Sequence, residues 1–253
     1  MSNSSTTECI CPAGLSRWST GNFWRNWHGM SDRTKLRRKP DRAVTARTAI
    51  DAVLDEGLVV HLGLIAGSDT GVHPVVIPML YARDGDHLLL HESPASCLLR
   101  TAKKGAEICV TVTLLDGLVL ARSGLRHSMN YRSVVVMGKT VVVTDYDEKV
   151  QALDRFVDHV IPGRVAAIRP VTATEVRNTT GLALSLKECS MKERTGPPID
   201  DDEDMAEDTW AGLIPLGISA GGPLPDEDTS GESVPAHVAD WARGPGLANG
   251  RGG

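Results

Sequence analysis

The chain has 253 residues, of which 41% are hydrophobic, and its formal net charge is −5. This length suits one large globular domain or two small ones, and the acidic balance gives no general attraction to nucleic acid or to an anionic membrane surface. No apolar run is long enough to cross a bilayer. The five cysteines are scattered and odd in number, which favours reduced thiols in a cytoplasmic protein over a disulfide framework or a metal site.

The N-terminal residues 1–32 are expected to form a flexible extension. They are rich in serine and threonine and show no periodic apolar face. A transit peptide and a translation start at Met30 are the alternative interpretations of this stretch. The following segment, Arg33 to Arg47, is basic, whereas Asp200 to Asp208 is acidic, so the small net charge hides an asymmetry.

The first regular elements are a helix and three strands. Ile50, Val53 and Leu54 share one helical face, which predicts a helix ending at Gly57. Strand-like runs follow at 58–65, 73–82 and 87–91, and the Asp84-Gly85 pair predicts a hairpin between the last two. A helix is predicted over 93–105.

The second half alternates strands with one clear helix. A strand over 107–122 is expected to fold back on itself around Asp116-Gly117, and another strand follows at 131–144. A helix is predicted over 145–160, capped by Asp145 or Asp147, and a last strand over 182–186. The predicted apolar face of that helix consists of Val150, Leu153, Val157 and Val160.

Short strands joined by hairpins, with few helices, favour a mainly β fold, an antiparallel barrel, over a βαβ fold. We expect one domain over residues 33–195. Residues 196–253 are rich in proline, glycine and acidic side chains, and we expect them to be packed only around 209–218 and disordered beyond.

Two polar clusters are candidate binding sites. Around His91, Ser93 and Ser96 a strand gives way to a helix, whose free N–H groups and dipole favour a phosphate; plain helix capping is the alternative. Tyr131, Arg132 and Ser133 follow a polar loop and enter a strand. An aromatic ring beside a guanidinium suits recognition of a phosphate and a ring, and a polar loop before an edge strand is the alternative.

Several motifs in order resemble those of one family. They are "RRKPDR", "VVIPMLYARDGDHLLLHESPASCLL" and "HSMNYRSVVVMGK", within a continuous similarity from Arg33 to about Arg164. The sequence resembles the pyridoxamine 5′-phosphate oxidase-like flavoproteins, and within them the flavin-nucleotide-binding branch that includes the nitroimidazole-resistance (Nim) proteins. The C-terminal Arg/Trp signature of true pyridoxamine phosphate oxidases is not found, so the vitamin B6 reaction is not expected.

This resemblance implies a split β-barrel with a few flanking helices that forms a homodimer and binds FMN between the subunits. It places the phosphate-binding turn at His91, Ser93 and Ser96, and a second element at Tyr131, Arg132 and Ser133. Independently of the resemblance, Arg37, Arg38 and Arg42 are candidates to add positive charge to the site, and a solvated basic arm is the alternative. The strand implied to contact the flavin ring comprises Val76, Ile77, Pro78, Met79, Leu80 and Tyr81.

Three hypotheses about function follow. The first is an FMN-dependent oxidoreductase that acts on a small electrophile such as a nitro or quinone-like compound, with Tyr131 and His127 as the only candidate catalytic groups. The second is a non-enzymatic flavin- or haem-binding protein, in which His91 or His127 would be the axial ligand. The third is a relative without flavin, because Cys97 and Leu98 stand where relatives carry Lys or Arg.

Overall fold

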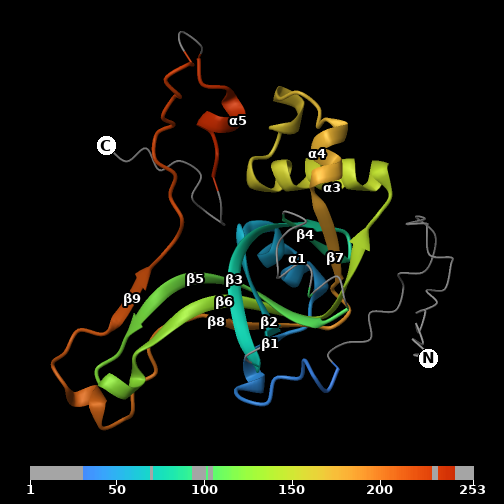
Figure 1. Ribbon diagram of the computed structural model, residues 1–253. Helices are drawn as coiled ribbons and strands as arrows, with labels where there is room; N and C mark the ends of the chain where they lie inside the picture. The colour runs from blue at the N-terminus through green and yellow to red at the C-terminus, as the bar shows by residue number, and fades with distance from the viewer. Residues whose placement is uncertain (1–30, 69–70, 93–100, 102–104, 230–232, 243–253) are drawn as a thin grey trace, which may run out of the picture.

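The computed structural model describes residues 31–242 apart from 69–70, 93–100, 102–104 and 230–232. In these residues nine strands form one antiparallel sheet, flanked by short helices (Figure 1). The strands are β1 (Ala43–Val44), β2 (Val59–Ser68), β3 (Gly71–Asp84), β4 (His87–Glu92), β5 (Glu107–Leu120), β6 (Ser128–Val143), β7 (Thr180–Ser185), β8 (Cys189–Arg194) and β9 (Gly212–Pro215). The α-helices are α1 (Arg47–Glu56), α3 (Tyr146–Val160), α4 (Ala173–Asn178) and α5 (Ala236–Ala239). The 3-10 turns include η1 (Pro40–Arg42), η2 (Gly124–Arg126), η3 (Val165–Ala167) and η4 (Asp204–Ala206).

The sheet closes on itself through β6. Each neighbour in the order β6-β7-β4-β3-β2-β5 is hydrogen-bonded to the next, and β5 pairs again with β6. The inner end of β6, residues 140–143, pairs with β7, and residues 131–136 pair with β8. Closure removes free strand edges and encloses a core. The predicted fold, a mainly β antiparallel split barrel with a few helices, is confirmed.

Helix α1 contributes to the barrel core. Its buried side chains, Ile50, Val53 and Leu54, are the three predicted from the helical spacing. The last carbonyl groups of a helix have no partner within it. Here the Tyr81 hydroxyl donates to Leu54 O at 2.5 Å, and the His159 ring Nε2 donates to Gly57 O at 2.8 Å. These two side chains join the end of α1 to β3 and α3.

Helix α3 covers one side of the barrel exterior. It begins at Asp145, whose carboxylate accepts from the Glu148 N–H at 2.9 Å, so the first of the two predicted caps is confirmed. The predicted apolar face was only partly right, since its members are half-buried and the buried side chains are Ala152 and Phe156. The reason is that the helix lies flat on the sheet along this i, i+4 pair, in contact with Ala82, Leu89, Val143 and Ala183.

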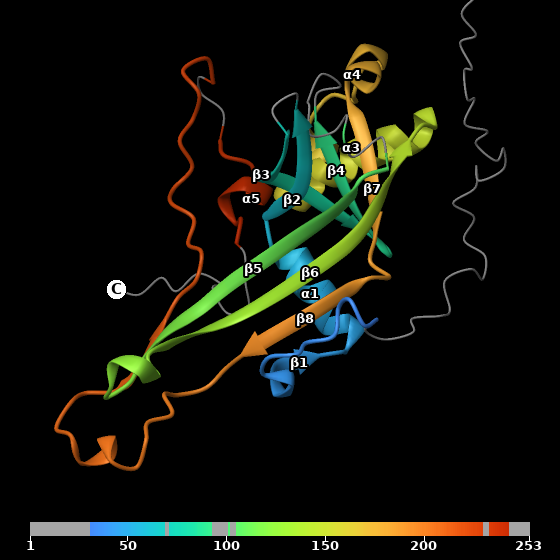
Figure 2. The ribbon, with the colours of Figure 1, turned by 60° about the horizontal axis from the view of Figure 1, so that its bottom comes forward.

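The strands β5 and β6 continue beyond the barrel as a long hairpin (Figures 1 and 2). Strand β9 pairs with the outer end of β5, and the chain then runs to α5, where the Trp241 indole donates to Val160 O at 2.8 Å. The predicted fold-back at Asp116-Gly117 was wrong, because β5 is continuous with only a bulge there. A Cβ on Gly117 would lie 2.8 Å from a Leu213 methyl, so this glycine permits the close approach of β9 and makes no turn.

The Asp84-Gly85 hairpin is confirmed, since Gly85 has a φ of 54° between β3 and β4. The helix predicted over 93–105 lies almost entirely outside the described residues. Among the described residues, no helix has the length and apolar character needed to cross a membrane.

Replacing Gly57 with alanine tests the junction at the end of α1. The new Cβ would lie 2.5 Å from a Val112 methyl and 2.7 Å from the Tyr81 hydroxyl, although the backbone φ of −67° suits any residue. We expect a loss of about 1–3 kcal/mol in the free energy of unfolding, measured by urea denaturation. Gly124→Ala is the control, because a Cβ there meets no atom within 4 Å. Equal stabilities of the two variants would contradict this packing.

Candidate functional site

The six residues predicted on β3 divide between the two sides of the barrel wall. Side chains alternate along a strand. The outward side chains are Val76, Pro78 and Leu80, and the inward ones are Ile77, Met79 and Tyr81. Val76 is 65% exposed, whereas Tyr81 is fully buried. Only the three outward side chains are therefore in a position to meet a ligand outside the barrel.

These outward side chains belong to a broader surface, which we name the open wall. It faces away from the core on the side of the barrel formed by β3, β2, β5 and β6, and its members are exposed or half-buried. Strand register places them side by side: His61 lies opposite both Pro78 and Thr111, and Thr111 lies opposite Val135. The open wall comprises Val76, Pro78, Leu80, Val59, His61, Gly63, Cys109, Thr111, Thr113, Tyr131, Ser133 and Val135.

Gly63 makes a shallow gap in the open wall. It lies opposite Val76 on β3 and Cys109 on β5. A Cβ built there would meet the Cys109 carbonyl oxygen at 3.6 Å and a Val76 methyl at 3.8 Å, which are ordinary contacts. Glycine in a strand often marks a place where a ligand approaches the backbone. The neighbouring His61 and Thr111 supply hydrogen-bonding groups beside this gap.

The open wall becomes cationic toward β8. Tyr131 and Ser133 of β6 lie opposite Arg194 and Lys192 of β8. The Ser133 hydroxyl is hydrogen-bonded to the Thr113 hydroxyl at 2.9 Å. The surface thus passes from aliphatic side chains on β3, through hydroxyl groups on β5 and β6, to positive charge on β8.

Arg194 is a buried cation, 8% exposed, whose hydrogen-bond acceptors among the described residues are all neutral. Its guanidinium donates to the Asn130 side-chain oxygen and to the carbonyl oxygens of Gly196 and Pro197, at 3.2 and 3.1 Å for the two carbonyls. Burial lowers the pKa of Arg194, and the nearby Arg42 lowers it further. Because a guanidinium keeps its proton in proteins, this position carries positive charge, and no carboxylate in the described part of the chain forms an ion pair with it.

Arg132 faces the opposite way from Tyr131 and Ser133 and is held by two carboxylates. It donates to Glu56 at 2.6 and 2.9 Å and to Asp116 at 2.7 and 3.0 Å. The hydrogen bond to Asp116, which is the larger cause, and the hydrogen bond to Glu56 both raise the pKa of Arg132. This geometry joins α1, β5 and β6, and it directs the guanidinium away from the open wall. The sequence placed Arg132 beside a phosphate; in the structure its partners are protein carboxylates.

The other predicted residues lie in different places. Arg38 is exposed, and its carbonyl oxygen accepts from the Lys192 ammonium at 3.1 Å. His91 faces α3, with its ring 4.2 Å from that of Phe156, edge to face. His127 is at the far end of the β5–β6 hairpin, where its ring nitrogen bonds Ser123 O at 2.9 Å. Ser93 and Ser96 lie outside the described residues.

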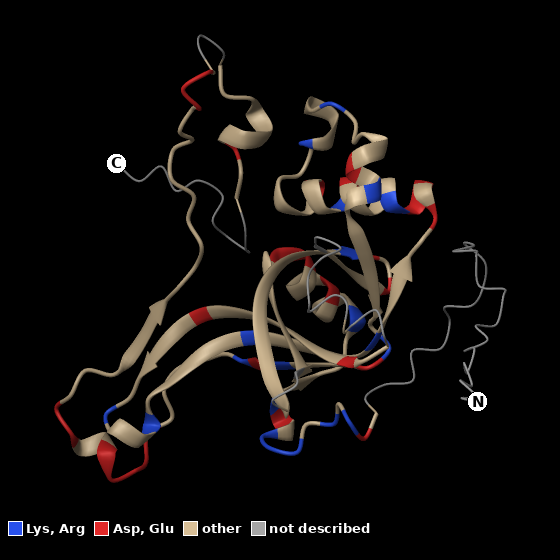
Figure 3. Cartoon of the chain, in the orientation of Figure 1, with Lys and Arg blue, Asp and Glu red and all other residues tan. Residues whose placement is uncertain are grey.

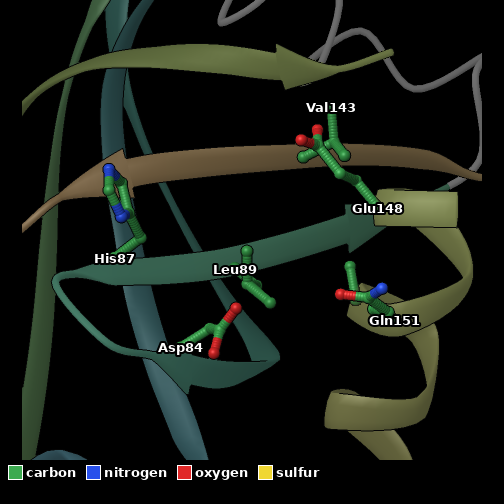
Figure 4. Close-up of a pocket in the computed structure, with 7 residues that line it drawn as sticks. Asp84, His87, Leu89, Val143, Glu148 and Gln151 are labelled. Carbon is green, nitrogen blue, oxygen red and sulfur yellow. The ribbon is translucent and has the colours of Figure 1, made fainter. Parts of the chain in front are cut away.

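A small cavity of about 110 Å³ lies between the β3–β4 hairpin and the first turns of α3 (Figure 4). Its lining includes Asp84, His87 and Glu148, and none of the predicted site residues. Burial lowers the pKa of His87. Pockets that hold drug-sized ligands have volumes of roughly 300–1,000 Å³, so this cavity is too small for a flavin. The open wall remains the better candidate.

Sequence reasoning missed His61 and Gly63. The signal that places both on the open wall is the alternation of the strand 58–65 combined with its pairing to Pro78 and Val76. The alternation can be seen in the sequence; the pairing cannot. Within the described residues, no group of three or more His, Cys, Asp or Glu is arranged to hold a metal ion.

The profile of the pyridoxamine 5′-phosphate oxidase family matches residues 46–193. The chain therefore belongs to this family, as its motifs predicted. No curated protein matches the chain.

Two solved structures are similar over most of the chain. One is the flavocytochrome Anf3 from Azotobacter vinelandii, with 37% identity, a TM-score of 0.78, and coverage of 85% of this chain and 98% of that one. The other is an FAD and heme binding protein from Mycobacterium smegmatis, with 38% identity, a TM-score of 0.73, and coverage of 78% and 95%. A putative 5-nitroimidazole antibiotic resistance protein from Bacteroides thetaiotaomicron has 22% identity, a TM-score of 0.49, and coverage of 59% and 85%.

Replacing Arg132 with methionine separates a structural from a ligand-binding role. The change leaves the carboxylates of Glu56 and Asp116 facing each other without a cation, in side chains that are mostly shielded from solvent. We expect a loss of about 2–4 kcal/mol in the free energy of unfolding at neutral pH. Arg126→Met is the control, because its ion pair with Asp201 is about half exposed and should contribute less than about 1 kcal/mol. A variant that keeps its stability and loses cofactor would restore Arg132 to the ligand site.

Proposed function

We propose that the protein binds a flavin nucleotide on the open wall and uses it as an oxidoreductase. The observation that carries the proposal is the gradient across that wall. Aliphatic side chains on β3 and the gap at Gly63 suit a planar apolar ring system, and the cations Lys192 and Arg194 suit a phosphate. The family supports this assignment, as do the two similar structures described as a flavocytochrome and as an FAD and heme binding protein.

FMN is the form that we propose, with Tyr131 and Ser133 between its ring and its phosphate. Ser93, Ser96 and His91, with Arg38 as a further cation, are the alternative phosphate site that the sequence predicts; His91 lies against Phe156 of α3 and not on the open wall, so the two phosphate positions exclude each other. FAD carries a second phosphate and an adenosine, which would extend the ligand farther along the wall. Release of the bound flavin by heat, followed by chromatography, distinguishes the two nucleotides.

A bound flavin supplies hydride or single-electron transfer. The chain's own contribution is to orient it and to control access of water. The hydroxyl groups of Thr111 and Thr113 and the ring of His61 lie on the open wall, where they are in a position to bond the polar edge of a ring. We propose a small electrophile, such as a nitro or quinone-like compound, as the electron acceptor. Reoxidation of the reduced protein by such compounds under anaerobic conditions tests this choice.

The open wall is also the surface on which we propose that a homodimer forms. Val76, Leu80 and Val59 are 65%, 45% and 41% exposed on adjacent strands. An apolar strand surface of this kind marks an interaction site in a folded protein. A second subunit would cover the ring and exclude water from it, so the flavin would lie between the subunits.

A cytoplasmic location is proposed from the cysteines. Cys109 is half-buried and Cys189 is buried, and both are free thiols. Burial raises the pKa of Cys189 to about 11, which keeps this thiol protonated and unreactive at neutral pH.

Replacing Gly63 with leucine tests the position of the ring. The added side chain would project from the middle of the open wall, where a Cβ makes only ordinary contacts. We therefore expect stability to change little and flavin affinity to fall by at least about tenfold, which corresponds to about 1.4 kcal/mol. Titration with FMN, followed by flavin fluorescence, gives the dissociation constants.

The matched control for this variant is Gly67→Leu, on the same strand and four residues farther from the proposed ring position. A Cβ at Gly67 meets only a Val72 methyl, at 3.9 Å. If both variants bind FMN as tightly as the parent protein, the flavin lies elsewhere. If the purified parent protein shows no flavin absorption and binds no added FMN or FAD, the proposed function is wrong.

A haem is the second candidate ligand, and His61 is the observation that favours it. Imidazole is a common axial ligand of haem iron, and His61 is exposed near the middle of the open wall. The two histidines predicted from sequence are less suitable. His91 packs against Phe156 beneath α3, and His127 is at the end of the hairpin.

We expect His61→Ala to lose haem, measured as loss of the Soret absorption band after reconstitution with haem. His127→Ala is the matched control and should keep the band, because this side chain is remote from the open wall. Retention of an unchanged band in His61→Ala would assign the iron to another ligand. If the parent protein shows no Soret band after reconstitution, haem binding under these conditions is excluded.

A further inference from the structure

Two surface segments of opposite charge lie far apart on the molecule. The acidic residues 200–208 form the loop at the outer end of the β5–β6 hairpin, and the basic residues 33–42 form a turn beside β1, below the barrel (Figure 3). The two segments are separate in both views of the ribbon, which differ by a rotation of 60° (Figures 1 and 2). The charge asymmetry of the sequence is thus a feature of the surface as well.

Part of the acidic loop is used within the chain. Asp200 accepts from the Arg122 guanidinium at 2.8 Å, and Asp201 pairs with Arg126, so these two pairs fasten the loop to the hairpin. The remaining carboxylates form no ion pair with any described cation. We name them the acidic tip: Asp202, Glu203, Asp204, Glu207 and Asp208.

The basic segment 33–42 also contains cations that form no ion pair with the described carboxylates. Arg33 pairs with Glu107 at 2.6 Å, but the next four cations form no ion pair with any carboxylate in the described part of the chain. We name them the basic turn: Lys35, Arg37, Arg38 and Lys39, all of which are exposed.

The hairpin end also exposes large apolar side chains beside the acidic tip. Leu125 is 98% exposed, Ile199 70%, Trp210 68% and Met205 58%. A projecting ribbon of few strands is marginally stable by itself in water, and exposed apolar side chains rimmed by charge mark interaction sites. The end of the hairpin, with the acidic tip and these exposed apolar side chains, therefore has the composition of a docking element.

We propose that the acidic tip of one copy of this chain docks on the basic turn of a second copy, and that the reverse contact forms at the same time. This arrangement is isologous, so one two-fold axis satisfies both charge patches of both copies. The inference rests on the homodimer proposed above and not on the cofactor. It explains why the hairpin extends beyond the barrel that it helps to close.

The charges favour a second copy over other partners. Each patch is opposite in sign to one that the same chain carries, and the separation of the two prevents them from meeting within one copy. A nucleic acid would be attracted by the basic turn and repelled by the acidic tip. An unrelated basic protein would satisfy the tip and leave the turn exposed. Only self-association uses both, with complementary charges that also fix the register.

Charge exchange between two variants gives a direct test. One variant carries Asp202→Lys, Glu203→Lys and Glu207→Lys, and the other carries Lys35→Glu, Arg37→Glu and Lys39→Glu. Each variant alone brings like charges together at both contacts, so we expect its dimer dissociation constant to rise on the order of a hundredfold. Mixed in equal amounts, the two variants restore opposite charges at both contacts, and we expect a heterodimer of nearly parental affinity.

Sedimentation equilibrium of each variant and of the mixture provides the measurement. The control is a triple variant with Asp226→Lys, Glu227→Lys and Asp228→Lys. It changes the net charge by the same amount as the variant of the acidic tip, but at an exposed site outside that tip. The control should dimerise like the parent protein. A mixture that stays monomeric, a control that dissociates equally, or variants that dimerise normally would each overturn the proposal. Flavin content, measured in parallel, shows whether the cofactor assignment stands independently.

Discussion

The structure depends on the closure of the barrel by β6. This strand of 16 residues pairs with β5 over residues 128–139, with β7 over residues 140–143 and, on its other edge, with β8 over residues 131–136. Closure buries the core side chains of seven strands and α1 in one compartment. The same strand continues past the barrel into the hairpin and carries Tyr131 and Ser133. Fold, candidate site and docking element are therefore coupled through one strand.

An asymmetric covering of the barrel follows from this closure. Helix α3 packs over β4, β7 and the end of β3, whereas the outward faces of β2 and β5 carry no helix in the described residues. Apolar side chains and a glycine on that open side are unfavourable in an isolated subunit unless another surface covers them. A planar cofactor and a second subunit are the coverings that the proposed function supplies.

Ion pairs hold the projecting parts in place. Arg132 joins α1 to β5 through Glu56 and Asp116, near the point where the hairpin leaves the barrel. Farther out, Arg122 binds Asp200 and fastens the acidic loop. Pairs that are shielded from solvent tolerate the loss of one partner poorly. The orientation of the hairpin is thus set by electrostatic contacts as well as by strand pairing.

The sequence by itself determined the local elements and the family. Alternation and turn residues were sufficient to predict β2, β3 and β4. Helical spacing predicted α1, and an acidic cap predicted the start of α3. These signals depend only on neighbours along the chain. Only the tertiary structure decided that Arg132 binds Glu56, 76 residues away, that Gly117 admits β9, and that His61 joins the open wall. Such contacts depend on which strands pair and in which register, and no local pattern specifies that pairing.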